Sequence, residues 1–232
     1  MSFFIETSSP EDWKSKLADP KHWKKNHSAM ALAYSWMEAK GFPKSVKDVF
    51  EKSEYPIFKN IEFLFGIVEH KVSLPGGRRP SQNDIFVLAI NQQELISIAV
   101  EGKVAESFGE LIVEWSKDKS AGKAVRLKFL CESLGLHKDS IQGIRYQLLH
   151  RTTSALLEAR RFNSSIAILL VHSFSQKNVG FHDYSRFAKH LGLMTAQLNT
   201  VHFAKRIDNV DLYLVWVTGN EKYLFIDEEK NG

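Results

Sequence analysis

The chain has 232 residues, of which 44% are hydrophobic and 25% are charged, so its composition is that of an ordinary globular protein. Its single cysteine, Cys131, excludes an intrachain disulfide. The longest aliphatic run, IAILLV at 166–171, is too short to span a bilayer, and the first ten residues lack the basic and apolar segments of a signal peptide. We therefore expect a cytoplasmic protein without membrane contact.

The net charge of +4 is unevenly distributed along the chain. Residues 117–161 contain ten Lys or Arg and four Asp or Glu, whereas the rest of the chain is slightly acidic. A basic segment in a near-neutral protein is typical of a surface that binds phosphate groups. The alternative is an ordinary solvated surface of helices, and the sequence leaves both interpretations open.

The first 54 residues predict three helices. The stretch SPEDWKSKLA begins with Ser9 as N-cap and Pro10 at the first helical position. SAMALAYSWMEAKG at 28–41 has apolar residues at helical spacing and ends at a glycine, and PKSVKDVFEK at 43–52 predicts a third, short helix. We interpret residues 1–54 as an N-terminal helical layer.

From residue 55 the pattern predicts strands and then alternating helices and strands. Residues 61–74 form a strand or one hairpin, 74–84 are rich in turn residues, and two further strands follow, up to 91 and over 94–103. Helices are predicted from directly after Lys103 to about 115, over 124–136, from about 141 to 162, and over 181–192. A strand buried on both faces is predicted at 164–174, and a late strand at 211–219.

This order predicts an α/β (α+β sandwich) fold, with a mixed central sheet flanked by helices. No linker in the sequence is long enough to separate two domains. We therefore expect one domain over 1–232, with a core at 55–220 and a tail at 221–232.

The strand ELISIAVEGK at 94–103 ends in a pair of opposite charges. Alternation along the strand places Ser97, Ala99, Glu101 and Lys103 on one face, and the preceding strand begins near Asp84. In a hairpin of this length the start of the first strand lies beside the end of the second. We therefore expect the Asp84 carboxylate to lie near Glu101 and Lys103.

Two carboxylates and a lysine at one end of a hairpin have a clear chemical use. Mg²⁺ takes oxygen ligands, and Asp84, Glu101 and the carbonyl of Gly102 could supply three. A bound metal would activate water and clamp a phosphate oxygen, while Lys103 could offset charge on the pentavalent phosphate. One alternative is a cross-strand salt bridge at a wet strand end. Another is a different enzyme that uses Glu69-His70-Lys71, which repeats the same acidic-x-Lys pattern in a predicted strand.

Asp84, sixteen intervening residues and then Glu101-Gly102-Lys103 resemble the motif of the PD-(D/E)xK nuclease superfamily, which has the restriction-endonuclease-like fold. The order of elements over roughly 55–220 is similar as well. Within that superfamily the chain also resembles an uncharacterised bacterial family with SQND, ISIAVEGK and QLLHRT segments. Two positions depart from the pattern: Asn83 stands where the motif has proline, and Gly102 stands where an apolar residue is usual.

The resemblance implies Mg²⁺- or Mn²⁺-dependent cleavage of phosphodiesters in nucleic acid, usually DNA, with Asp84 and Glu101 as metal ligands and Lys103 as the catalytic lysine. It allows a homodimer, because many nucleases of this fold pair. The alternative is a nuclease-like fold without catalysis that binds nucleic acid or protein.

Other residues could support this site. The predicted helix at 141–162 carries Gln147 and Arg151 at one edge of its apolar face, and some branches of the superfamily place a helix glutamine beside the metal. Glu106 could bind the metal through water, or complement the dipole of a helix that begins after Lys103. Arg78 and Arg79, in the turn-rich segment, could contact phosphate.

Overall fold

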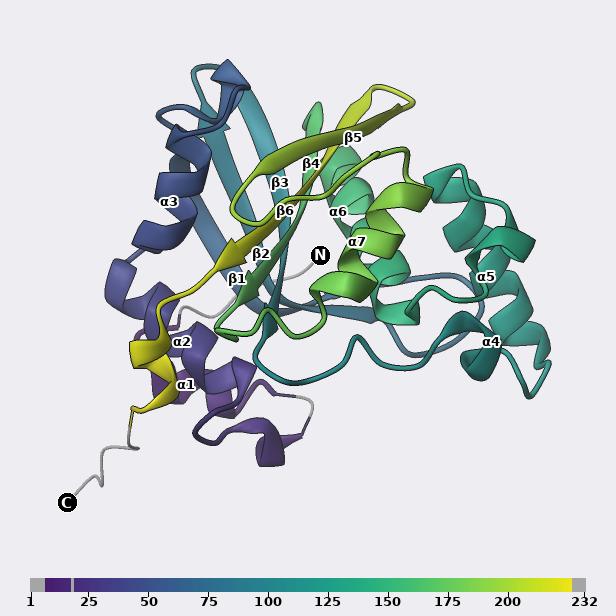
Figure 1. Cartoon of the computed structure of the whole chain (residues 1–232), viewed down its shortest axis with the longest axis horizontal. Helices are drawn as coiled ribbons and strands as arrows, with labels where there is room; N and C mark the ends of the chain where they lie inside the picture. Colours follow the sequence, from purple (N-terminus) through teal and green to yellow (C-terminus); the bar gives the residue numbers. More distant parts are fainter. Residues whose placement is uncertain (1–6, 18, 227–232) are drawn as a thin grey trace.

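The computed structural model describes residues 7–17 and 19–226 and contains one six-stranded mixed sheet (Figure 1). The strand order is β1-β2-β3-β4-β6-β5. Neighbouring strands are antiparallel, except that β3 pairs with β4, and β4 with β6, in parallel. The predicted mixed sheet flanked by helices is confirmed. The strands are β1 (Glu62–Val72), β2 (Ser81–Asn91), β3 (Glu94–Lys103), β4 (Ile166–Ser173), β5 (Val201–Ile207) and β6 (Val210–Thr218).

Helices cover both faces of the sheet (Figure 1). The N-terminal helices lie on one face and the later helices on the other, so two apolar cores form, one on each side. The helices are α1 (Pro10–Lys14), α2 (Ser28–Ala39), α3 (Lys44–Glu51), α4 (Ile112–Trp115), α5 (Ala121–Leu134), α6 (Tyr146–Arg161) and α7 (Phe181–His190), with short 3-10 turns at 20–22, 56–58, 138–141 and 221–224.

Burial explains why β3 and β4 lie in the centre of the sheet. Every residue of β4 is buried, as the aliphatic run predicted, because helices cover both of its faces. In β3 the alternating residues Ile96, Ile98 and Val100 face the N-terminal helices, while Ala99 packs on the side of α5–α7. The Ser97 hydroxyl donates to the Ala155 carbonyl of α6 at 3.1 Å, which ties that side of β3 to the helix.

Several expected boundaries were wrong. The helix expected directly after Lys103 begins only at Ile112, and the helix expected from about 141 begins at Tyr146. Residues 61–74 contain one strand and no hairpin. The sequence reading missed β5, although VHFAKRI and the two-residue turn Asp208–Asn209 before β6 are a hairpin signal.

Residues 221–224, expected within a tail, form a 3-10 turn that packs against α2 and buries Leu224, whereas the end of that tail, 227–232, lies outside the described residues. Among the helices of the described residues, none is long and apolar enough to cross a membrane.

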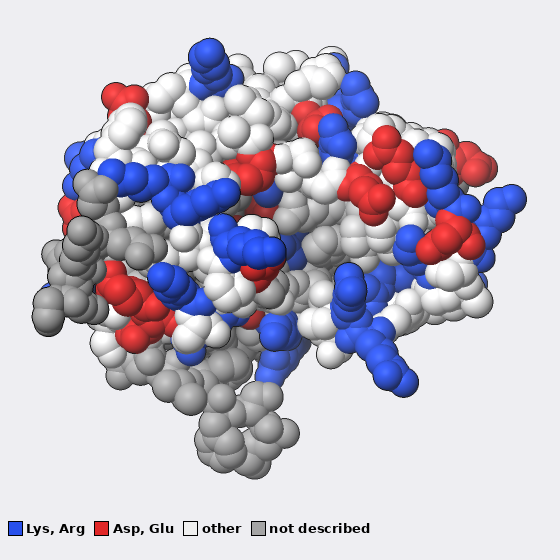
Figure 2. Space-filling view, turned by 90° about the horizontal axis from the view of Figure 1, so that it is seen from below, with Lys and Arg blue, Asp and Glu red and all other residues white. Residues whose placement is uncertain are grey.

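One end of the sheet carries the predicted site. β1 and β3 finish there and β2 begins there, between the N-terminal helices and α4–α6 (Figure 1). Seen from below, Lys and Arg side chains gather around the middle of the molecule, with Asp and Glu side chains between them (Figure 2).

Candidate functional site

Strand alternation places the charged end of β3 as expected. Glu101 and Lys103 point toward α6 and are almost fully buried, with 2% and 4% of their surface exposed. Gly102 points to the opposite face, against α2. A Cβ atom at Gly102 would lie 3.3 Å from atoms of Ser28, Leu32 and Asp84, so the close approach of α2 leaves little room for a side chain. This crowding accounts for the glycine where the nuclease motif has an apolar residue.

Asp84 lies beside this strand end. The last β2–β3 pair is Ile85 with Val100, so Asp84 stands one residue beyond the ladder. Its Oδ2 accepts a hydrogen bond from the backbone N–H of Gly102 at 2.7 Å, and 23% of its side chain is exposed. The structure therefore brings Asp84, Glu101 and Lys103 together, as hairpin geometry predicted. The backbone group of Gly102 that contacts Asp84 is its N–H, whereas its carbonyl was the predicted metal ligand.

Both oxygens of the Glu101 carboxylate already have cationic partners. Lys103 Nζ donates to Oε1 at 2.7 Å, and Arg151 Nε donates to Oε2 at 2.5 Å. Nη2 of Arg151 also lies 3.9 Å from Asp84 Oδ1. One guanidinium group thus faces both carboxylates that were expected to share a metal.

The two helix residues named from the sequence both reach the site. α6 packs across β3, and its first turn carries Gln147, whose Oε1 accepts from Lys103 Nζ at 3.0 Å. Arg151 follows one turn later on the same face. The Lys103 ammonium also lies 4.7 Å from the centroid of the Phe108 ring. These contacts orient the Lys103 ammonium group between Glu101, Gln147 and the Phe108 ring.

Glu69 is a third carboxylate near the site. From the sequence, Glu69 was considered only as part of the alternative Glu69-His70-Lys71 motif. It lies in β1 between residues paired with Asn83 and Ile85, and the Gln82 side chain donates to its carboxylate. Its backbone is left-handed, with φ of 53°, which is unusual for a glutamate inside a strand. Of the rival motif, His70 lies 3.1 Å from Glu158 of α6, whereas Glu69 belongs to the same cluster as Asp84. The sequence signal that could have placed Glu69 near Asp84 was the antiparallel pairing of its strand, β1, with the strand that carries Asp84.

The pKa values show that negative charge in this cluster is only partly compensated. Burial, together with Glu101 and Glu69, raises the pKa of Asp84 well above its usual range. Burial also raises the pKa of Glu69 to about 7. Burial opposes ionisation of Glu101 too, but Arg151 and Lys103 outweigh it and lower its pKa. Asp84 and Glu69 therefore favour the protonated form, whereas Glu101 favours the ionised form.

Three further predicted residues are Glu106, Arg78 and Arg79. Glu106 was expected as a water-mediated metal ligand or in the first turn of a following helix, and the second of these expectations is wrong. It precedes α4 by six residues and accepts from the backbone N–H groups of Ser28, at 2.8 Å, and Val104, at 2.7 Å, so it caps the start of α2. Arg78 and Arg79 are exposed in the loop between β1 and β2.

Asn83, where the motif has proline, is fully buried, and neither polar atom of its amide has a hydrogen-bond partner among the described residues.

The donor set fits a hard cation in chemistry, because carboxylates and water are the ligands that Mg²⁺ and Mn²⁺ prefer. The fit rests on Asp84 and Glu101. Within 7–17 and 19–226, no group of three or more His, Cys, Asp or Glu side chains is arranged to hold a metal ion. A cation that reached Glu101 Oε2 would have to replace the Arg151 guanidinium.

Comparison with known proteins finds one relationship. Searches among curated proteins and among solved structures found no match. A family described as Domain of unknown function (DUF6946) matches residues 6–221, which include the three N-terminal helices, the whole sheet and the carboxylate cluster. Because this match covers most of the 232 residues, the chain belongs to the DUF6946 family.

Proposed function

We propose that the protein is a metal-dependent phosphodiesterase that cleaves DNA, similar to the PD-(D/E)xK nucleases. The observation that carries the proposal is the convergence of Asp84, Glu101 and Lys103 at one end of the sheet, where the Asp84 carboxylate lies beside those of Glu101 and Glu69. Carboxylates that repel one another in a buried site are stabilised by a divalent cation.

Asp84 and Glu101 would hold Mg²⁺ or Mn²⁺. When bound, the metal would lower the pKa of a water molecule and offset charge on a phosphate oxygen. Lys103 would place its ammonium group against the negative charge that develops on the phosphate, and its low exposure strengthens that interaction. Gln147, which accepts from the same ammonium group, is a positioning residue for Lys103.

Arg151 has a second role in this proposal. To free Glu101 Oε2, its guanidinium has to leave the carboxylate, and a planar guanidinium pairs well with phosphate oxygens. Arg151 would then bind the substrate phosphate that accompanies the metal. The exposed Arg78 and Arg79, at the same end of the sheet, would add phosphate contacts outside the cluster.

The test is incubation of the protein with plasmid and oligonucleotide DNA in Mg²⁺ or Mn²⁺. Lys103→Ala and Glu101→Gln should each reduce cleavage at least about a hundredfold, which is the usual loss when a group that stabilises the transition state is removed. Lys128→Ala, at a largely exposed lysine of α5, is the matched control and should cut normally. Circular dichroism checks that the variants fold. Cleavage that persists unchanged in both site variants overturns the proposal.

A second candidate is a binding module without catalysis. It is favoured by the Arg151 contacts, because the guanidinium pairs with Glu101 Oε2 and faces Asp84, in the place that a bridging cation would need. Calorimetric titration with Mn²⁺ separates the two functions. The nuclease should show a site that Asp84→Asn removes, whereas an inert module should show no such site.

A further inference from the structure

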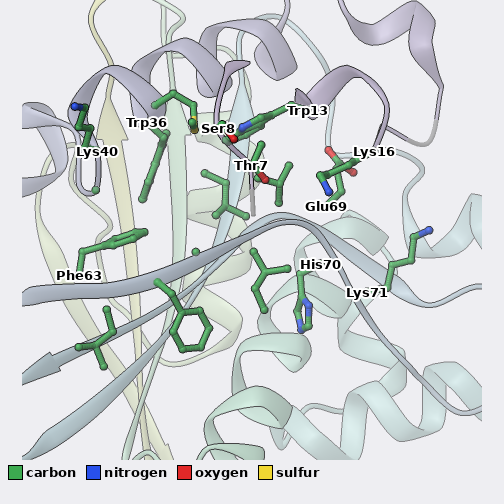
Figure 3. A pocket seen from close by; sticks show the side chains of 18 of the residues that line it. Thr7, Ser8, Trp13, Lys16, Trp36, Lys40, Phe63, Glu69, His70 and Lys71 are labelled. Carbon is green, nitrogen blue, oxygen red and sulfur yellow. The ribbon is translucent and has the colours of Figure 1, made fainter. Parts of the chain in front are cut away.

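A wide groove runs beside the carboxylate cluster, between β1 and the helices α1 and α2. Its volume is about 1280 Å³. Figure 3 shows Trp13 and Trp36 entering from the helices, with Phe63 and Glu69 on the side of β1. β1 is the edge strand of the sheet, so one wall of the groove is not covered by a further strand.

The charges around this groove are mainly positive. Lys16 and Lys40 follow the helices α1 and α2, Lys71 lies in β1, and Arg161 is the last residue of α6. Glu69 is the only carboxylate among the described lining residues. No ion pair of Lys16, Lys40 or Lys71 forms within the described part of the chain, whereas Arg161 lies 3.4 Å from Glu158. The rim is thus complementary to an anionic ligand.

One exposed aromatic side chain also lines the groove, at the edge of β1. Phe65 is 38% exposed, and its ring packs at its edge against Phe86 and Phe162, on the face of the sheet opposite to α1 and α2. The Phe63 ring lies over the neighbouring Gly66, where a Cβ would come within 3.0 Å of that ring. Aromatic side chains therefore border the groove on both faces of β1.

An exposed aromatic ring beside a cationic rim favours a ligand that carries both flat rings and phosphates. Unpaired bases stack on aromatic side chains while basic residues follow the backbone. In a duplex the base faces are already stacked on one another, so they are not available to Phe65. The surface chemistry thus favours single-stranded over double-stranded nucleic acid.

Glu69 links this groove to the candidate site. Its carboxylate lines the groove and is close enough to Asp84 and Arg151 to interact with them electrostatically. We propose that the groove binds a single-stranded segment of nucleic acid and leads it past Glu69 to Asp84 and Glu101. This inference rests on the proposed function for its substrate class, but the binding step itself requires no metal.

The test measures fluorescence anisotropy of a labelled oligo-dT strand and of a duplex of equal length, in EDTA over a range of salt concentrations. A triple variant, Lys16→Gln with Lys40→Gln and Lys71→Gln, should bind the single strand at least tenfold more weakly. It should also lower the salt slope by about 2, because each lost phosphate contact contributes about 0.7. Phe65→Ala should weaken binding roughly tenfold and leave the salt slope unchanged, because stacking is not ionic.

Lys44→Gln with Lys128→Gln is the matched control, since both lysines are highly exposed and lie outside the groove. Equal affinity and equal salt slope in the wild type and the triple variant would overturn the inference, as would tighter binding of the duplex than of the single strand. If the wild type cleaves DNA while the groove variants bind normally, the inference fails and the proposed function stands. If the groove variants lose binding but no variant or wild type cleaves in Mn²⁺, the groove stands and the nuclease proposal fails.

Discussion

Replacing Arg151 by Gln tests the arrangement of charges at the site. The Arg151 side chain is 9% exposed, and its Nε lies 2.5 Å from Glu101 Oε2. Removing one partner of a buried ion pair typically costs about 3–5 kcal/mol, because the other charge remains buried. Lys103 still pairs with Oε1, and the contact of Arg151 with Asp84 is long at 3.9 Å. We therefore expect a loss near the lower end, about 3 kcal/mol, in the free energy of unfolding without metal.

Mn²⁺ should reverse much of this loss. Without the guanidinium, Glu101 Oε2 and Asp84 are free to bind a cation. A ligand at a hundred times its Kd stabilises the folded state by about 2.7 kcal/mol. In the wild type the cation must first displace Arg151, so the same Mn²⁺ concentration should stabilise the wild type less than the variant.

The assay is urea denaturation followed by tryptophan fluorescence, with EDTA and with Mn²⁺. Arg160→Gln is the control on the same helix, since Arg160 forms only an exposed ion pair with Asp208. That control should cost less than about 1 kcal/mol and should respond to Mn²⁺ as the wild type does. The reasoning is refuted if Mn²⁺ stabilises Arg151→Gln no more than the wild type, or if Arg151→Gln costs no more than the control.

Three further variants test individual features of the site. The pKa of Glu69 is about 7 in the folded protein and near 4.5 when unfolded, so the folded state binds more protons between these values and its stability falls as the pH rises through them. Glu69→Gln should therefore be more stable than the wild type at pH 8, by up to about 3 kcal/mol, and similar at pH 4.5; parallel stability–pH curves from thermal unfolding would contradict this. Gly102→Ala should cost about 1–3 kcal/mol in chemical denaturation, because the new methyl group meets atoms of α2 and Asp84 at 3.3 Å, and an unchanged midpoint would show that α2 adjusts freely. Glu106→Ala should cost about 1–2 kcal/mol through the lost cap of α2 while leaving Mn²⁺ affinity in calorimetry intact, and a weakened metal site would return Glu106 to the binding machinery.

The sequence by itself determined the local geometry of the strand pair. Side chains alternate along a strand with a period of two, so Glu101 and Lys103 had to share a face, and the length of the hairpin had to return Asp84 to the same corner. The aliphatic run of β4 likewise predicted a strand covered on both faces, because only such a strand is apolar at every position. These inferences depend only on residues close together in the sequence, either within one strand or across one hairpin turn.

Only the tertiary structure decided which groups surround that corner. The sequence named Arg151 as a neighbour, but the packing of α6 on β3 determined that its guanidinium faces both carboxylates. Glu69 itself has a left-handed backbone conformation inside β1, and no strand pattern predicts such a conformation or the place of its side chain in the cluster. Glu106 binds the start of a helix 78 residues earlier in the chain. Such contacts depend on how whole elements pack, and the periodicity of a single segment carries no information about its partner.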